Sequence, residues 1–288
     1  MNIKETHIAT FQNKPIRLQE YGVGIFETTP TKSALKKALK KQLIKVNGKL
    51  ATTATYISGG EEIVLHVPEV VQPSKKLIFP LEVLYEDDYL SVVYKPAGIA
   101  VSGNRFKTIA NALSQNLKLS TERDATRPQP VHRLDYPTTG VLLVGKTNGC
   151  IRALNELFEL KKIKKTYYAV TTGKMKPVGD IRFSIDGKES YSQYEVVQTV
   201  PSDRFGTLNL VKLIPKTGRK HQLRKHLSSI GNPILGDQQY GIEDLILKGK
   251  GLYLHACSLK FEHPFTGKEI CLSSDLPKKF TRIFDLEK

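Results

Sequence analysis

Beyond Leu81 the chain alternates short strand-like runs with a few helical segments, and this pattern limits the folds open to it. The strand-like runs are rich in Val, Ile, Leu and Tyr, and they read SVVYK, VLLVG, TYYAV, LNLVKLI and LYLHACSL. Three segments have helical periodicity instead, namely TIANALSQNL, CIRALNELFEL and HQLRKHLSSI. This mixture favours an α+β domain built on a mixed or largely antiparallel sheet.

The length and the charge of the chain limit what it can bind. A chain of 288 residues can bury a substantial core and is expected to divide into one large and one small domain. Its 44 Lys and Arg residues against 28 Asp and Glu residues give a net charge of +16. A surplus of this size suits a polyanion, so nucleic acid is the first partner to consider.

The cysteine content and the hydropathy of the chain indicate the cellular compartment in which the protein is expected. The three cysteines are Cys150, Cys257 and Cys271, and their odd number and wide spacing argue against a disulfide framework or a zinc cluster. No apolar run approaches the roughly 18 residues that a membrane helix needs. The start MNIKETHIAT lacks the apolar stretch of a signal peptide. These features predict a cytoplasmic protein without a membrane segment.

The basic surplus is concentrated in two tracts, and the first, residues 28–60, holds no acidic residue between its ends. Within it, TPTKSALKKALKKQL reads as an amphipathic helix capped near Thr31, since Leu35, Leu39 and Leu43 recur every fourth residue. A row of lysines on a helix is often no more than a solvated face. The alternative is a surface that binds RNA phosphates, and the candidate residues are Lys32, Lys36, Lys37, Lys40 and Lys41.

Short β elements follow this helix. The sequence IKVNGKL contains the Val-Asn-Gly-Lys signal of a tight hairpin, and a second hairpin-like run ends in YISGGEEIVLHV. Over about residues 20–68, this order of elements resembles the small RNA-binding domain first described in a small-subunit ribosomal protein. The segment VVQPSKKLIFP, with two prolines, reads as a linker. We therefore predict an RNA-binding domain at residues 1–70, a linker at 71–80 and a large domain at 81–288.

Three other patterns do not support the chemistry that they suggest. GVLLVGKT satisfies the phosphate-loop pattern GxxxxGK[ST], but VLLV is itself strand-like, whereas a phosphate cradle needs a flexible loop. His221 and His226 are five residues apart, so they point from different faces of a helix. Asp87 and Asp88 in EDDYL fit a polar turn into a strand better than a magnesium site. No metal site is predicted.

The second basic tract, residues 204–236, also lacks acidic residues. Its segment PKTGRKHQLRKHLSSIGNPILGDQQYG opens with a Thr-Gly turn and continues as a helix whose Leu223, Leu227 and Ile230 face inward. Arg224 lies at the border of this buried stripe, where a guanidinium group is held rigidly. A rigid arginine near a cleft needs an anion as its partner.

The candidate anion is Asp135, in the stretch VHRLDYPTTG that precedes the apolar run VLLV. An Arg and an Asp two residues apart are most often a solvated turn with a weak ion pair. Here, however, HRLDYPTTGVLLVGKT resembles the motif H-R-L-D-x-x-T-S-G-x-L-L-[VA]-x-[AG]-K-T of the RluA-type pseudouridine synthases. Other family blocks occur in order over nearly all of residues 81–275: YEDDYLSVVYKPAGIAV before this motif, then KTYYAVTTG, TGRKHQLRKHLSSIGNPILGDQQYG and LHACSLKFEHPFTGKEI.

Three positions depart from the family pattern. Thr139 replaces the usual Ser, Tyr136 stands where a basic residue is frequent, and Lys220 replaces a usual Thr or Ser. None of these departures touches the acid, so they concern substrate contacts more than chemistry.

The resemblance implies an enzyme that converts uridine in structured RNA into its carbon-linked isomer. This reaction breaks the bond between base and sugar, rotates the base and rejoins it through carbon, so the family needs no cofactor and no metal. The family pattern assigns Asp135 as the catalytic carboxylate, with Arg224 beside it to keep it ionised. The carboxylate can add to the anomeric carbon or take a neighbouring proton, and the sequence leaves both routes open.

The same resemblance assigns further residues. Tyr167 of KTYYAVTTG matches the tyrosine that stacks on the base; the alternative is a strand residue in the core, with Tyr168 as its neighbour on the other face. Arg133 can reach the vacated position in the RNA stack, or a flanking phosphate, after the base flips out. The predicted substrate-binding residues are Arg133, His132, Arg219 and His221.

The predicted substrate is ribosomal RNA ahead of transfer RNA, because the extra N-terminal module is common on ribosomal enzymes of the family, and the predicted state is a monomer. Two other classes of protein remain open. A non-catalytic RNA-binding or assembly protein would carry the same charge, and a metal-dependent nuclease would cleave RNA strands and be sensitive to chelators. Turnover of a uridine-containing RNA without metal distinguishes these classes.

Overall fold

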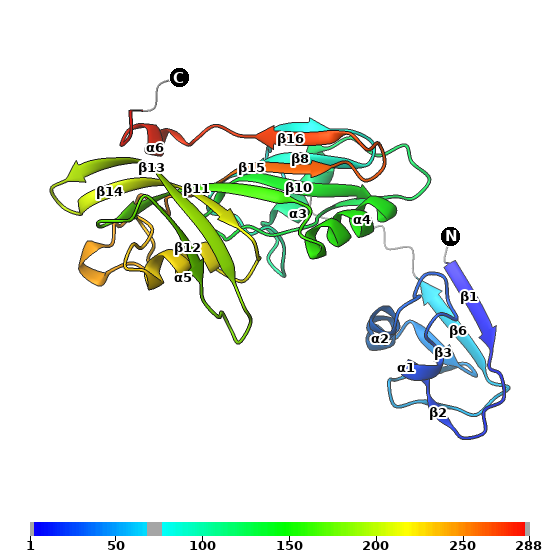
Figure 1. Cartoon of the computed structure of the whole chain (residues 1–288). Helices are drawn as coiled ribbons and strands as arrows, with labels where there is room; N and C mark the ends of the chain where they lie inside the picture. The colour runs from blue at the N-terminus through cyan, green and yellow to red at the C-terminus, as the bar shows by residue number, and fades with distance from the viewer. Residues whose placement is uncertain (1–2, 68–76, 286–288) are drawn as a thin grey trace. The chain divides into compact units, whose positions relative to one another are not determined.

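The computed structural model describes residues 3–67 and 77–285, and the chain forms two compact units, Met1–Ser74 and Lys75–Lys288 (Figure 1). Each unit has its own secondary structure and its own core. Most of the linker predicted at residues 71–80 lies outside the described residues.

The N-terminal unit combines two helices with a small antiparallel sheet and a two-stranded ribbon. The sheet has the strand order β1-β6-β3-β4, and β2 pairs with β5 in the ribbon. A core that includes Leu18, Leu35 and Ile63 holds these elements together. The strands are β1 (Ile3–Ile8), β2 (Ile16–Arg17), β3 (Ile44–Val46), β4 (Lys49–Leu50), β5 (Tyr56–Ile57) and β6 (Glu62–Val67), and the helices are α1 (Leu18–Tyr21) and α2 (Lys32–Lys40).

Helix α2 forms where the lysine-rich segment predicted a helix. Thr31 caps it, because its Oγ1 accepts a hydrogen bond from the backbone N–H of Ala34 at 3.2 Å. Leu35, Ala38 and Leu39 are buried, whereas the lysines of the predicted RNA surface are exposed. Apolar residues at every third and fourth position thus direct the lysines to solvent.

The two hairpin predictions had different outcomes. Asn47 and Gly48 have positive φ angles of 47° and 76°, and they join β3 to β4 in the predicted tight turn. The run YISGGEEIVLHV is not a hairpin, because β5 pairs with β2 whereas β6 pairs with β1 and β3. Gly59 and Gly60 therefore connect two different sheets. Strand β1 was not predicted, and it extends this unit on the N-terminal side of the expected core at residues 20–68.

The large unit is built on one ten-stranded sheet, and every run predicted to be a strand forms one. The strand order is β12-β13-β14-β11-β15-β10-β8-β7, with β16 paired to β15 and β9 paired to β10. Among the described strand pairs, β10–β15 alone is parallel, so the predicted mixed and largely antiparallel sheet is confirmed. The strands are β7 (Val83–Glu86), β8 (Leu90–Lys95), β9 (Ala125–Pro130), β10 (Thr139–Thr147), β11 (Lys164–Thr172), β12 (Val178–Arg182), β13 (Tyr191–Ser202), β14 (Gly206–Pro215), β15 (Leu254–Glu262) and β16 (Glu269–Ser273).

Helices cover both faces of the sheet at β10. Val141 and Leu143 share a hydrophobic cluster with residues of α4, whereas Leu142 and Val144 share another with residues of α3. Successive side chains of a strand point to opposite faces, so a strand buried on both faces needs an uninterrupted apolar run. The VLLV segment is therefore a buried strand and not a phosphate-binding loop. The helices of this unit are α3 (Ile109–Asn116), α4 (Asn148–Glu159), α5 (Gln222–Ser229), the short 3₁₀ helix η1 (Glu243–Leu245) and α6 (Lys278–Thr281).

Candidate active site

Asp135 lies in the loop between β9 and β10, and a buried lysine ties this loop together. Lys95, at the end of β8, donates hydrogen bonds from Nζ to the carbonyl oxygens of Pro96, Tyr136 and Thr138 at 3.0, 3.2 and 2.7 Å. The backbone N–H of Thr138 donates to the Asp135 carbonyl at 3.0 Å, which closes a turn directly after the acid. These contacts fix the backbone that carries Asp135.

Lys95 was not among the predicted site residues. Its side chain is fully buried, and burial lowers its pKa to about 8, while the negative charge of Asp135 opposes this shift. The signal that could have found it is its place directly after the apolar run SVVY. A lysine is buried in such a position only when its ammonium group has hydrogen-bond partners.

The register of the sheet places Tyr167 close to the start of β10. Ala256 of β15 pairs with Gly140 of β10 on one side and with Tyr167 of β11 on the other. Burial, followed by the charge of Asp135, raises the pKa of Tyr167, so its hydroxyl group stays protonated at neutral pH within electrostatic range of the acid. Tyr168 faces the other side of the sheet, where it lines a cavity of about 300 Å³.

Arg224 approaches Asp135 but is held mainly by a second carboxylate. Its Nη1 lies 3.5 Å from Oδ2 of Asp135. Its Nε and Nη2 donate to the two carboxylate oxygens of Asp237 at 2.7 and 2.8 Å, and the Asp237 side chain is completely buried. The anion expected beside Arg224 is therefore a pair of carboxylates, and only the more distant one, Asp135, was predicted. Asp237 stands in the GDQQYG segment, which begins six residues beyond the end of the predicted helix HQLRKHLSSI.

His221 is the second positively chargeable group that faces Asp135. It precedes α5 with a left-handed backbone, φ 56°, and its Nε2 lies 3.8 Å from Oδ1 of Asp135. Its Nδ1 forms a hydrogen bond with the hydroxyl group of Tyr240 at 3.0 Å. Burial lowers the pKa of His221, and the charge of Asp135 only partly offsets this effect. The imidazole is therefore mainly neutral at neutral pH.

The other predicted substrate-binding residues lie at different depths. Nε2 of His132 accepts a hydrogen bond from the backbone N–H of Leu143 at 3.0 Å, and burial lowers the pKa of this histidine to about 3. Arg133 is exposed. Arg219 is also exposed, and its Nε donates to the carbonyl oxygen of Glu189 at 3.1 Å. The substrate contacts assigned to these three residues stay predictions.

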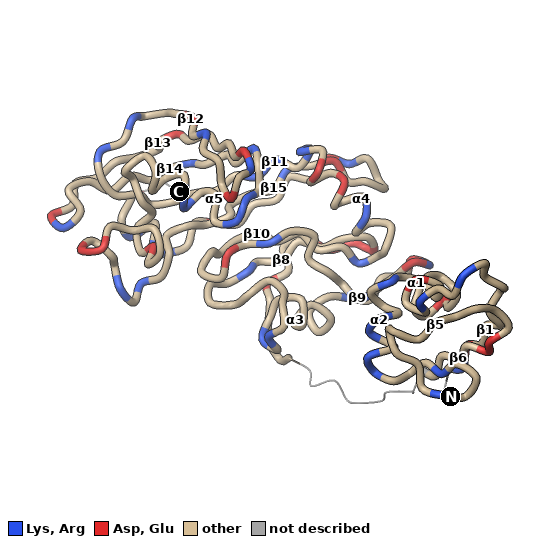
Figure 2. Tube along the Cα trace, turned by 90° about the horizontal axis from the view of Figure 1, so that it is seen from below, with Lys and Arg blue, Asp and Glu red and all other residues tan. Residues whose placement is uncertain are grey.

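The lysines of α2 belong to the N-terminal unit and are exposed there. Figure 2 marks basic positions along this helix in blue. Lys32 forms an ion pair with Glu20 of α1 at 2.5 Å, so part of its charge is already neutralised. Lys36, Lys37 and Lys40 follow it along the exposed side of the helix.

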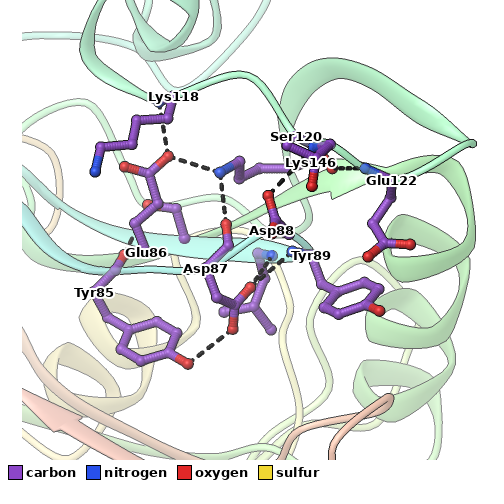
Figure 3. A network of polar contacts seen from close by, with 12 residues as sticks. Tyr85, Glu86, Asp87, Asp88, Tyr89, Lys118, Ser120, Glu122 and Lys146 are labelled. Carbon is purple, nitrogen blue, oxygen red and sulfur yellow. Dashed lines mark hydrogen bonds and ion pairs between the residues drawn. The ribbon is translucent and has the colours of Figure 1, made fainter.

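The EDDYL segment is a polar turn, as predicted, and it bonds to the loop at residues 118–121 and to Lys146 of β10 (Figure 3). The Asp87 carboxylate accepts hydrogen bonds from the Tyr85 hydroxyl group and from the backbone N–H groups of Tyr89 and Leu90, each at 2.8 Å. Buried Lys146 bonds to Glu86 at 2.8 Å and to the Asp87 carbonyl at 2.6 Å. The carboxylates of Glu86 and Asp87 therefore have a structural role.

Two kinds of feature are absent from residues 3–67 and 77–285. No group of three or more His, Cys, Asp or Glu side chains there is arranged to hold a metal ion. No helix in the same residues combines the length and the apolar character that crossing a membrane requires.

Known proteins resemble this chain in sequence and in fold. Residues 89–229 match the family model described as RNA pseudouridylate synthase. Ribosomal large subunit pseudouridine synthase C of Rickettsia bellii is 32% identical over 305 residues, which cover 94% of this chain and 98% of that protein. The protein of the same name from Yersinia pestis is 34% identical over 278 residues, with coverage of 85% and 84%.

Solved structures agree with this family. Human RNA pseudouridylate synthase domain containing 4 is 28% identical, has a TM-score of 0.56, and covers 69% of this chain and 90% of its own. Asp135, Tyr167 and Arg224 all fall inside the segment that the family model matches. With relatives above 30% identity over most of its length, the chain belongs to the RNA pseudouridine synthases, a family of isomerases that act on RNA.

Proposed function

We propose that this enzyme isomerises specific uridines of large-subunit ribosomal RNA and that Asp135 is its catalytic carboxylate. The observation that carries the proposal is the grouping of Asp135 with Arg224, His221 and Tyr167 in a chain of this family. The ribosomal substrate is supported by relatives that are named ribosomal large subunit pseudouridine synthase C.

Asp135 has the environment that this chemistry requires. Pseudouridine formation develops charge on the ribose when the base leaves, and a carboxylate can respond by adding to the anomeric carbon or by taking a neighbouring proton. The Asp135 side chain is 16% exposed, so a small part of it can be reached by a substrate. Arg224 places a positive charge 3.5 Å from this carboxylate.

The remaining predicted residues have proposed roles around this acid. Tyr167 stacks on the flipped uracil ring, and Arg133 occupies the gap in the RNA stack or binds a flanking phosphate. His132, Arg219 and His221 complete the substrate contacts. Arg133 and Arg219 are exposed and can reach RNA from the surface, whereas His132 would contribute through its position next to Arg133.

The N-terminal unit has the proposed role of RNA affinity. Exposed lysines on α2 and at its C-terminal cap can neutralise phosphates without contributing to the chemistry, and the candidates are Lys32, Lys36, Lys37, Lys40 and Lys41. We propose the domain borders 1–70 and 81–288, with a linker at 71–80, for an enzyme that acts in the cytoplasm as a monomer. The predicted monomeric state can be tested by analytical sedimentation at the protein concentrations that the activity assays use.

Asp135→Asn tests the catalytic assignment. Asn has nearly the same size and can still accept a hydrogen bond from Arg224, but it is a far poorer nucleophile or base. We expect single-turnover conversion of uridine to be abolished, with RNA binding at one stated salt concentration retained or slightly stronger. Comparable rates for wild type and variant would refute the role of Asp135, and an equal loss of rate and binding would indicate a structural ion pair.

Mapping of pseudouridine in total RNA, with and without the gene, tests the substrate. Loss of modification at a uridine of large-subunit RNA is the expected result. Loss confined to transfer RNA would overturn the ribosomal assignment and leave the activity in place.

A further inference from the structure

One turn, residues 237–240, contacts both side chains that the described residues place within 4 Å of Asp135 as ion-pair partners, Arg224 and His221. Asp237 binds Arg224 through two hydrogen bonds, and Tyr240 binds His221 through one. We propose that this turn, called here the orienting turn, positions Arg224 and His221 for catalysis and keeps them from neutralising Asp135. The proposal rests on the catalytic role proposed for Asp135.

Asp237 determines which edge of the guanidinium group Asp135 can use. The carboxylate of Asp237 occupies Nε and Nη2 of Arg224 at 2.7 and 2.8 Å, which leaves Nη1 toward Asp135 at 3.5 Å. A planar guanidinium group held at two nitrogens has a fixed plane, and in this position only Nη1 comes within 4 Å of Asp135. Asp135 therefore receives one long contact from Arg224 in place of a bidentate pair, which leaves its carboxylate more available to a substrate.

Asp237 is itself held firmly. Its Oδ1 also accepts hydrogen bonds from the backbone N–H groups of Gln239 and Tyr240 at 3.0 and 3.1 Å. Burial disfavours its charged form, but the bonds from Arg224 and from these N–H groups outweigh burial and lower its pKa. An ionised carboxylate with four donors around it has a fixed orientation, so it can fix Arg224 in turn.

Tyr240 links the same turn to His221. The Arg224 guanidinium carbon lies 5.0 Å from the centre of the Tyr240 ring, and the Tyr240 hydroxyl group lies 3.0 Å from Nδ1 of His221. Because His221 is mainly neutral, a hydroxyl group that donates to Nδ1 leaves the imidazole proton on Nε2, which lies 3.8 Å from Asp135. The Tyr240 carbonyl accepts a hydrogen bond from Ser228 of α5 at 2.8 Å, which ties the turn to the helix.

Loss of the Asp237 charge would leave Asp135 as the one carboxylate within 4 Å of Arg224 among the described residues. Arg224 would then rotate to form a bidentate pair with Asp135, and the substrate would have to break that pair. The effect belongs to the chemical step, because neither Asp237 nor its bonds to Arg224 reach the protein surface. This separates an orienting role from one in RNA binding.

Asp237→Asn and Tyr240→Phe test the proposal in the full-length enzyme on the RNA that it modifies. Asn keeps the oxygen that accepts from Gln239 and Tyr240, and Phe keeps the ring, so each variant removes little besides the orienting contact. Asp186→Asn is the matched control, because Asp186 pairs with neighbouring Lys225 at 3.5 Å but is 71% exposed. The measurements are the single-turnover rate at saturating RNA, the dissociation constant for RNA, and the pH dependence of the rate.

We expect Asp237→Asn to slow the chemical step by about 100-fold, the scale of a misplaced catalytic group, with RNA affinity within about threefold of wild type. In Tyr240→Phe, the acid limb of the pH–rate profile should move to higher pH, because His221 loses the donor that favours its neutral form. Around His221, the charges of Asp135 and Asp237 raise its pKa, and those of Arg224 and Lys220 lower it; all four remain in this variant. The control should match wild type in all three measurements.

Suppose that Asp135→Asn is inactive but Asp237→Asn, assayed under the same conditions, has the wild-type rate. This result would overturn the orienting role and leave the proposed function intact. A loss of rate equal to that of Asp186→Asn would overturn it too. Should Asp237→Asn fail to fold, Tyr240→Phe decides: an unshifted pH profile counts against the proposal. Activity in Asp135→Asn would instead remove the proposed function on which the inference rests.

Discussion

Tyr167 and Tyr168 are neighbours in the chain but lie on opposite faces of β11. Tyr167 is in electrostatic range of Asp135, whereas Tyr168 lines a cavity with Cys257 and Leu276 on the other face. We expect Tyr167→Phe to leave the fold and RNA affinity unchanged and to slow the chemical step, because only the hydroxyl group is lost. Single-turnover rates at saturating RNA measure this.

Tyr168→Phe is the control for this pair. It removes the same atom from the same strand, so a general effect of a lost tyrosine hydroxyl group would appear in both variants. A loss of rate in Tyr168→Phe together with a normal rate in Tyr167→Phe would show that the assignment within the pair is wrong.

Buried neutral histidines make stability depend on pH. Burial lowers the pKa of His255 from 6.5 to about 4, while its ring nitrogens bond to Thr139 at 2.8 Å and to Ser274 at 3.1 Å. Between these two pH values the unfolded chain takes up a proton that the folded chain does not, so the free energy of unfolding falls as the pH is lowered. Burial also lowers the pKa of His132, to about 3, so this histidine too makes the free energy of unfolding fall as the pH is lowered.

We therefore expect the melting temperature of the wild type to fall between pH 6.5 and pH 4, and to fall less steeply in His255→Gln, which has no group that titrates in this range. Thermal denaturation followed by circular dichroism at several pH values measures both slopes. Parallel slopes for the two proteins would contradict a contribution from His255.

At the scale of elements, the β10–β15 pairing depends on one glycine. Gly140 has a φ angle of 120°, and a Cβ atom placed on it would lie 2.1 Å from the carbonyl oxygen of Ala256. Gly140→Ala would force apart the parallel strands that set the position of the Asp135 loop. We expect a loss of at least about 3 kcal/mol in the free energy of unfolding, measured by urea denaturation.

Gly103→Ala is the matched control for this strand pair. Gly103 has a similar φ angle of 129°, but a Cβ atom placed on it would have no heavy atom within 4 Å beyond its chain neighbours. In Gly103→Ala, the free energy of unfolding should therefore fall only by the cost of the unfavourable φ angle, about 1–3 kcal/mol. Equal losses in the two variants would mean that the contact with Ala256 costs nothing.

Elements that depend on local sequence patterns were predicted correctly, whereas features that depend on long-range contacts were missed. The apolar run VLLV and the leucine spacing of α2 are local properties, and both elements formed as predicted. The failed hairpin at Gly59 and Gly60 depends on distant parts of the chain, since β5 and β6 pair with β2 and β1 near its start. Asp237 and Lys95 were missed for the same reason, because their partners come from other elements.

At the scale of the whole molecule, affinity and chemistry are proposed to reside in different units. Each hydrophobic cluster in the described residues draws its members from one unit: one cluster lies in the N-terminal unit and three lie in the large unit. The net charge of +16 pointed to a polyanion from composition alone. Composition could not show where the charge acts, because electrostatic attraction depends on how the cations are placed.

Changing Lys36, Lys37, Lys40 and Lys41 to Gln tests this division of roles. If these α2 lysines bind phosphates, each lost contact reduces the slope of log K against log salt by about one. Affinity should therefore fall at low salt and its salt dependence should flatten, while the single-turnover rate at saturating RNA stays as in wild type. Filter binding over a salt series measures the slope.

A control with the same loss of charge separates placement from total charge. Lys248, Lys250, Lys268 and Lys278 are exposed in the large unit, away from α2 in the sequence, and changing them to Gln lowers the net charge equally. Because salt dependence counts the counterions released at actual phosphate contacts, we expect this variant to keep more of the wild-type slope. Identical slopes for the two sets would show that the α2 lysines act only through the overall charge, and the N-terminal unit would lose its proposed role in RNA affinity.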